Sequence, residues 1–132
     1  MPEIPSSYGQ RILVINDFAT MRELLQRILA GEGYDVVCVP TLGQPTGVPD
    51  IRFDLVITNT RAPDESGQDV IREIHQVFPG VPVLHLDDLT RPLRSALPRG
   101  VPSIPMPFSI PALLLAVDHL LQRDSREPER TA

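Results

Sequence analysis

The feature that most constrains the fold is a run without polar alternation near the middle of the chain. Asp54 opens it, residues 55–58 read Leu-Val-Ile-Thr, and Asn59 ends it. A strand that is apolar on both faces is typical of the interior of a parallel sheet, where helices cover both sides. In an open α/β sheet, the residue at the carboxyl end of such a strand points into the crevice where ligands bind. Asn59 is therefore the first candidate for a functional residue.

Segments on both sides of this run alternate between strand and helix patterns. Ala62-Pro63 predicts a turn after the central strand, and Ser66-Gly67 opens the next helix. Thr20 to Glu23 is a capping-box pattern, and Ser109 is placed to cap the last helix. The predicted strands are 11–15, 34–39, 54–59, 83–86 and 101–106, and the predicted helices are 20–30, 68–77 and 110–123. Right-handed crossovers then predict an α/β doubly wound parallel sheet of order 2-1-3-4-5.

The 15 prolines mark where helices should fail. Residues 40–49 contain three prolines and two glycines, and each interior proline costs a helix about 3 kcal/mol. This segment is predicted to be a loop with at most a single turn. Two prolines likewise restrict residues 90–100 to little more than one helical turn, and Pro102 and Pro105 confine the fifth strand to a sheet edge.

Composition and charge exclude several classes of function. The net charge of −5 argues against nucleic acid as the main partner, because phosphate binding needs a clustered basic face. No apolar run approaches the roughly 20 residues of a membrane span, and no signal peptide is recognisable, so a cytoplasmic location is expected. Cys38, the one cysteine, is predicted to be a buried small hydrophobe. One domain is expected over residues 10–123, between a loose lead-in at 1–9 and a mobile tail at 124–132.

The central stretch resembles the third strand and following loop of bacterial response-regulator receiver domains, the phospho-accepting modules of two-component signalling. The matching residues are Asp54, Leu55, Val56, Pro63 and Gly67. The resemblance covers about residues 10–123. It implies a flavodoxin-like five-stranded sheet, in which the family's second and fourth helices are shortened or lost because of the prolines. In that family the strand ends with an Asp that accepts a phosphoryl group, whereas this chain has Asn59.

The resemblance also implies a site at the carboxyl edge of the sheet. Family members hold Mg²⁺ with two acidic residues after the first strand together with the acceptor Asp, because this ion prefers carboxylate oxygens and water. The corresponding residues are Asn16, Asp17 and Asn59, so one carboxylate remains. The neutral amide of Asn59 is a poor nucleophile and cannot give an acyl phosphate.

Two further family positions bind the phosphoryl oxygens after transfer. The Thr or Ser after the fourth strand corresponds to Asp87, which would repel a phosphoryl group. The Lys at the end of the fifth strand corresponds to Met106, and the chain contains no Lys that could replace it. The aromatic residue that often signals the active state corresponds to Ser103. The family's Lys-Pro bond is usually cis, which implies a cis bond between Met106 and Pro107.

These replacements predict a degenerate receiver, or pseudo-receiver, that acts as a phosphorylation-independent protein-interaction module. The resemblance suggests a histidine kinase or a downstream signalling protein as the partner, and a homodimer is a further candidate. Receivers commonly work through the face made by their fourth helix, fifth strand and fifth helix. Leu115, predicted to face solvent on the last helix, and Ser103 are the candidate partner surface, although a single exposed leucine is ordinary.

The alternative function is binding of a divalent metal or a small ligand in the vacated crevice. Asp17 and Asp87 could converge there with Asn59, and Mg²⁺ is the one cofactor implied. Asp87 would equally be explained as a solvated residue at a strand end or as a cap of the following turn.

The chain is predicted not to be an enzyme. The loop at residues 16–20 has no glycine that could cradle a phosphate, and no cluster of Cys and His is present. His75 and His119 are predicted to lie on the surface. His85, inside a strand pattern, is predicted to be a hydrogen-bonded residue of the core.

Overall fold

The computed structural model describes residues 9–42, 52–59, 67–88 and 100–126. Within them lie the strands β1 (Arg11–Ile15), β2 (Asp35–Val39), β3 (Leu55–Asn59), β4 (Val83–Asp88) and β5 (Ser103–Met106), and the helices α1 (Ala19–Gly31), α2 (Gly67–Val77) and α3 (Ile110–Arg126). Most of the predicted lead-in, the predicted turn at Ala62-Pro63 and most of the two proline-rich segments fall outside the described residues, so these predictions stay open.

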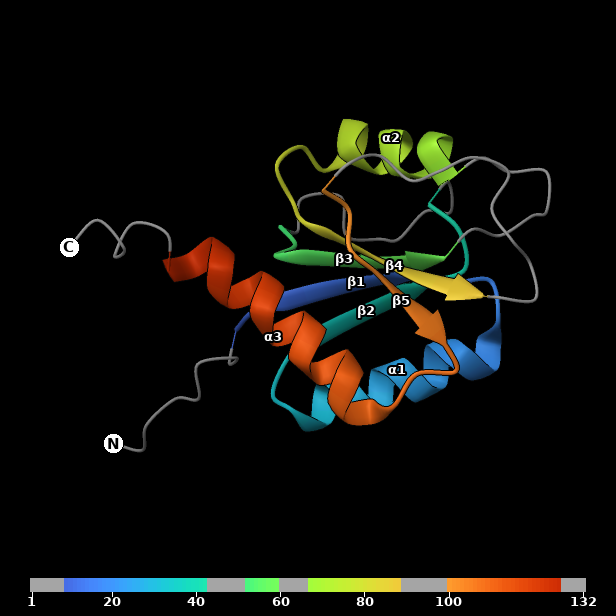
Figure 1. Ribbon diagram of the computed structural model, residues 1–132, viewed down its shortest axis with the longest axis vertical. Helices are drawn as coiled ribbons and strands as arrows, with labels where there is room; N and C mark the ends of the chain where they lie inside the picture. Colours follow the sequence, from blue (N-terminus) through green and yellow to red (C-terminus); the bar gives the residue numbers. More distant parts are fainter. Residues whose placement is uncertain (1–8, 43–51, 60–66, 89–99, 127–132) are drawn as a thin grey trace.

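All five strands pair in parallel, in the order β2-β1-β3-β4-β5. This confirms the predicted α/β doubly wound sheet. Figure 1 shows α2 on one face of the sheet and α1 with α3 on the other. β3 lies at the centre, and all five of its residues are buried. Helices on both faces therefore explain why this strand has no polar alternation.

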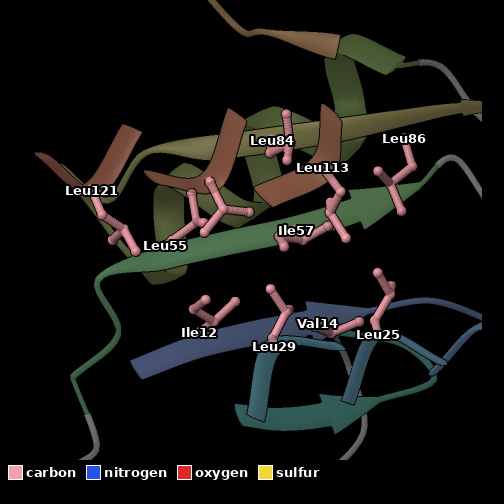
Figure 2. Close-up of a cluster of buried hydrophobic side chains, with 11 residues drawn as sticks. Ile12, Val14, Leu25, Leu29, Leu55, Ile57, Leu84, Leu86, Leu113 and Leu121 are labelled. Atoms are coloured by element: carbon pink, nitrogen blue, oxygen red, sulfur yellow. The ribbon is translucent and has the colours of Figure 1, made fainter. Parts of the chain in front are cut away.

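Two apolar clusters fill the space between the sheet and the helices. The first joins β1, β3 and β4 to α1 and α3, and Figure 2 shows Leu29 of α1 and Leu113 of α3 pointing toward a sheet that presents Ile57. The second packs Val56 of β3 against Ile71 of α2. Because neighbouring residues of β3 enter different clusters, one strand anchors both layers.

The first helix begins differently from its prediction. Its N-cap is Phe18, with no side-chain cap, and Ala19 is its first residue. The capping box predicted from Thr20 is therefore wrong, because Asn16 Oδ1 accepts from Phe18 N at 2.9 Å and turns the chain into the helix earlier. The cap of the last helix is confirmed, since Ala112 N donates to Ser109 Oγ at 3.1 Å.

The fifth strand tolerates proline because it lies at the sheet edge. His85 N donates to Pro102 O at 3.0 Å. In a parallel ladder, every second residue directs its backbone N–H and C=O groups toward the neighbouring strand. Since Pro102 bonds to β4, Pro105 directs its backbone groups away from β4, and its missing N–H costs no hydrogen bond of the ladder. The strand starts at Ser103, later than the predicted residue 101. The bond between Met106 and Pro107 is cis, as the resemblance implied.

Two helix ends depart from the periodicity prediction. Val77, the last residue of α2, is 53% exposed, and Ile110, the first residue of α3, is 49% exposed. Helical spacing places both residues on the side of the helix that faces the core. Each lies in the terminal turn of its helix, where fewer core side chains are present to cover it. α3 also runs to Arg126, three residues beyond its predicted end at 123.

Candidate functional site

Two buried asparagines are neighbours where the central strands end. Ile15 of β1 pairs with Thr58 of β3, so the next residues on the two strands, Asn16 and Asn59, are neighbours. Asn16 N donates to Val39 O at 3.1 Å, which extends the hydrogen-bonded ladder past the end of β1. The two asparagines are only 1% and 3% exposed, so their amides are held inside the protein.

Hydrogen bonds fix the orientation of both amides. Asn59 Nδ2 donates to Asp17 Oδ1 at 3.1 Å. Asn16 Oδ1 accepts from Phe18 N at 2.9 Å. Asn16 therefore uses its oxygen and Asn59 uses its nitrogen in a hydrogen bond within the protein. The structure thus brings together Asn16, Asp17 and Asn59, the residues that the resemblance places at the metal positions.

The other end of each amide is buried without a partner. In the part of the chain that the structure describes, neither Asn16 Nδ2 nor Asn59 Oδ1 finds a hydrogen-bond partner. Buried polar atoms are nearly always paired, so an unpaired one calls for an explanation. Here the two atoms are of opposite kind, since Nδ2 is a donor and Oδ1 is an acceptor.

Arg22 is a residue of this site that the sequence did not reveal. Its Nη1 donates to the backbone oxygen of Asn16 at 2.8 Å. The guanidinium thereby reaches back from the first turn of α1 to the end of β1. The sequence places Arg22 near the start of the helix that follows the Asn16-Asp17 pair, but it gives no signal for this particular contact.

Asp87 is directed elsewhere. Leu86 pairs with Asn59 across β3 and β4, and the following residue points to the opposite face of the strand. On that face burial lowers the pKa of His85, and the charge of Asp87 opposes part of this shift. Among the described residues, no group of three or more His, Cys, Asp or Glu side chains comes together as a metal site.

His85 is a hydrogen-bonded core residue, as predicted. It is 1% exposed, and its Nδ1 lies 3.1 Å from Ser103 Oγ on the neighbouring strand. Burial lowers the pKa of His85 from its ordinary value of 6.5, and the carboxylate of Asp87 opposes that shift. The imidazole therefore favours its neutral form and links β4 to β5.

The surface histidines and the cysteine have simpler environments. His75 and His119 are exposed, as predicted. Cys38 packs against the apolar cluster as a small hydrophobe, but it is only half-buried, so the predicted burial is only partial. β2 is an edge strand, and Cys38 Sγ lies 3.7 Å from the backbone oxygen of Arg22 and 3.6 Å from Gln26 Oε1. Burial raises the pKa of this thiol, which disfavours the reactive thiolate.

The residue at the family's Lys position belongs to the core. Met106 is half-buried and packs against the cluster that joins the sheet to α1 and α3. Pro107, which follows it, is exposed. A thioether in this place offers no positive charge to the sheet edge, and it fills apolar space instead.

An apolar groove lies between α3 and the segment that leads into β5. Leu115 is 71% exposed, which confirms the prediction that it faces solvent. The groove has a volume of about 790 Å³, and its lining residues are Gly100, Val101, Pro102, Ala112, Leu115, Ala116, His119 and Leu120. On the helix these lining positions recur at helical spacing, so they form one stripe beside the segment that leads into β5. Ser103, next along the chain, is exposed.

The geometry has counterparts in known proteins. The family model for the response regulator receiver domain matches residues 12–89, more than half of the chain. The DNA-binding response regulator MtrA of Mycobacterium tuberculosis (strain ATCC 25618 / H37Rv) is 34% identical over 125 residues, which cover 90% of this chain and 54% of MtrA. The chain belongs to the response regulator receiver family.

Solved receivers share the fold of this one. A CheY-like receiver domain protein from Methanospirillum hungatei superposes with a TM-score of 0.71 at 22% identity, covering 89% of this chain and 98% of that one. The non-phosphorylated HemR receiver domain of Leptospira biflexa gives a TM-score of 0.63 at 25% identity, covering 86% and 94%. This receiver spans about half the length of MtrA. None of its described helices is long and apolar enough to cross a membrane.

The residues at the sheet edge are poor ligands for the Mg²⁺ ion that the family implies. Mg²⁺ is bound through carboxylates and water in an octahedral arrangement. Of the three side chains at the edge, only Asp17 carries a carboxylate, and Asn59 turns its NH₂ group toward it. An amide N–H occupies the side of Asp17 Oδ1 that a bridging cation would need.

Proposed function

We propose that this receiver acts without phosphorylation, as a protein-interaction module in signal transduction. The observation that carries the proposal is the state of Asn59, the residue at the phospho-acceptor position. It is buried at the end of β3, with its amide nitrogen donating to Asp17 at 3.1 Å. On this basis the receiver is degenerate, and its fold is retained as a binding surface.

The chemistry of phosphoryl transfer explains why this residue decides the matter. A carboxylate attacks phosphorus with a full negative charge, whereas the amide of Asn59 is neutral. A transferred phosphoryl group also needs a cation beside it, and the chain has no Lys. We therefore expect neither phosphoryl transfer nor any other catalysis by this chain.

The groove beside Leu115 is the surface we assign to the interaction. A soluble protein rarely leaves such a stripe of apolar side chains open without a use for it. The partner would be a protein that inserts apolar side chains along α3, with Ser103 at the margin of the contact. A histidine kinase, a downstream signalling protein and a second copy of the chain are the candidate partners.

The first experiment tests the absence of phosphorylation. Purified protein is incubated with acetyl phosphate and Mg²⁺ beside a receiver that has the full acidic site, and intact masses are measured. We expect the control receiver to gain a phosphoryl group and this chain to keep its mass. A phosphoryl adduct on this chain would refute the proposal.

The second experiment tests the interaction surface. Wild type, Leu115→Arg and the control Val77→Arg are immobilised and compared in pull-downs from the native organism. Val77 is a suitable control because it is also exposed but lies on α2, on the other face of the sheet. We expect wild type and Val77→Arg to retain the same protein, and Leu115→Arg to lose it, with or without acetyl phosphate. Equal retention by all three would exclude this surface.

The alternative of a divalent cation held by Asp17 and Asp87 has less support. Asp17 receives the amide N–H of Asn59, and Asp87 acts on His85 on the opposite face of its strand. Calorimetry with Mg²⁺, Mn²⁺ and Ca²⁺ at millimolar concentration tests it directly, and we expect no heat of binding.

A further inference from the structure

The two edges of the sheet differ in how they are protected against pairing with another strand. β5 forms one edge, and Pro105, whose backbone groups point away from β4, interrupts its outer row of hydrogen-bonding groups. β2 forms the other edge and contains no proline between Asp35 and Val39. In the described part of the chain, no strand pairs with the outer side of β2. An apolar edge strand of this kind is a template for a further strand.

The hydrogen bonds between β2 and β1 show which backbone groups of β2 point outward. Asp35 N and Val39 O, at its two ends, bond to the residues that flank β1, at 2.9 and 3.1 Å. In a parallel strand every second residue faces the same neighbour, so Val36 and Cys38 face away from β1. Each of these two residues therefore presents one N–H and one C=O group on the outer edge. Both are only half-buried.

A second copy of the chain offers the matching set of groups. If two β2 strands run antiparallel about a two-fold axis at Val37, Val36 of one copy lies opposite Cys38 of the other. Residues opposed in this way exchange both of their backbone hydrogen bonds. The two-fold symmetry repeats the pair on the other side of the axis. All the outward N–H and C=O groups of both strands are thereby satisfied.

The residues on either side of β2 favour this register over its neighbours. A shift of the axis to Cys38 would place Val36 opposite Pro40, which has no N–H to donate. A shift in the other direction would place Cys38 opposite Tyr34, whose N–H already bonds to the backbone of α1 at 3.3 Å. The register centred on the middle of β2 avoids both losses.

The side chains of β2 agree with this pairing. Asp35 is the one charged residue in the sequence Asp-Val-Val-Cys-Val. In the central register it lies opposite Val39 of the second copy, so the two carboxylates do not face each other. Asp35 also pairs with Arg11 Nε of its own chain at 3.0 Å. The rest of the contact is apolar, and like charges do not oppose it.

We infer that two copies of this receiver associate through the outer edges of their β2 strands, which joins their two sheets into one continuous sheet. β2 and β5 are opposite edges of the sheet, and the groove beside Leu115 lies next to the segment that leads into β5. The inference therefore concerns a second surface and goes beyond the proposed function. A pair of five-residue strands is short beside stable interfaces, which bury about 1,200–2,000 Å², so we expect a weak dimer.

The first experiment measures the mass of the full chain by sedimentation equilibrium, from micromolar to millimolar concentration. We expect the average mass to rise from 14.6 kDa toward twice that value. Val36→Pro removes an outward N–H but no bond to β1, so this variant should stay monomeric. Val36→Ala keeps the N–H and should dimerise like wild type, and so should Leu115→Arg. Circular dichroism reports whether each variant is folded.

The second experiment tests the register by cross-linking. In a Cys38→Ser background, Val37→Cys places two thiols across the two-fold axis. Cα atoms opposed at such a position lie about 4.5 Å apart, which suits a disulfide. Oxidation should give a covalent dimer on a non-reducing gel. Asp35→Cys in the same background should stay monomeric, because residue 35 lies opposite Val39 of the second copy.

The inference is overturned if wild type keeps the monomer mass at millimolar concentration, or if Val36→Pro dimerises as wild type does. A dimer that is lost in Leu115→Arg but kept in Val36→Pro would place the contact at the groove and would also overturn it. Equal cross-linking through residues 35 and 37 would rule out the register. Each of these results can occur while acetyl phosphate still gives no adduct, so failure of this inference is distinguishable from failure of the proposed function.

Discussion

The two ends of the same central strands are built in contrasting ways. At the amino ends, Asp54 Oδ2 accepts from Arg11 N at 2.8 Å, and Asp54 N donates to Arg11 O at 2.8 Å. Arg11 Nε also pairs with Asp35 Oδ2 at 3.0 Å. At the carboxyl ends, Asn16 and Asn59 each leave a buried polar atom without a partner among the described residues.

We call the amino ends of these strands, with Asp54, the structural end, and the carboxyl ends, with Asn16 and Asn59, the functional end. Asp54 is held by hydrogen bonds to the backbone of Arg11 on the neighbouring strand. Natural proteins depart from complete pairing mainly at functional sites. The comparison therefore supports a structural role for Asp54 and agrees with our proposal that the carboxyl ends of the central strands form the altered receiver site.

The largest expected effect comes from restoring a carboxylate at the functional end. Asn59→Asp places two carboxylates where Asn59 Nδ2 now donates to Asp17. We expect the free energy of unfolding to fall by about 3 kcal/mol without divalent ions, because a buried charge loses its hydration and faces a like charge. Millimolar MgCl₂ should recover most of this loss. Urea unfolding with and without MgCl₂ measures both, and wild type should not respond to the ion.

At the structural end, Asp54→Ala should be the next largest in effect. It removes a charge-assisted hydrogen bond to Arg11 N, so we expect a loss of about 2 kcal/mol in urea unfolding. Asn59→Leu at the functional end should cost less than about 1 kcal/mol, since it removes a buried unpaired oxygen together with the bond to Asp17. If both variants lost the same stability, the distinction between the two ends would fail.

The sequence predicted the structural end better than the functional one. The unbroken apolar run before Asn59 predicted a central strand, and all five residues of β3 are buried. Asp54 belonged to the family resemblance, but its hydrogen bond with Arg11 N was not predicted. The capping box at Thr20 failed because Asn16 Oδ1 competes with it by accepting from Phe18 N.

The unpaired amide atoms could not have been predicted. They depend on which way each side chain turns, which is set by contacts across the sheet such as that of Asn59 with Asp17. The contact of Arg22 with the backbone oxygen of Asn16 is likewise a matter of rotamer. Residue types and spacing locate a site, but they do not give its hydrogen-bond directions.

A smaller effect concerns His85, on the face of the sheet opposite the amide pair. Burial lowers its pKa in the folded state below 6.5, so the unfolded chain binds the proton more tightly. The free energy of unfolding should therefore rise with pH below about 6.5, and its slope should level off above that value. Urea unfolding as a function of pH measures this slope. His85→Leu should remove it, whereas His75→Gln, at an exposed position, should keep it.

The smallest effect on stability should come from Leu115→Arg. The side chain is 71% exposed, so the change removes little buried apolar surface, and we expect less than about 0.5 kcal/mol in urea unfolding. The same substitution should abolish partner retention, because an arginine beside Ala112 and Ala116 puts a charge into the apolar groove. A substantial loss of stability would instead make Leu115 a structural residue like Asp54. A neutral effect on stability with loss of binding would assign the exposed side chain of Leu115 to partner binding and not to the fold.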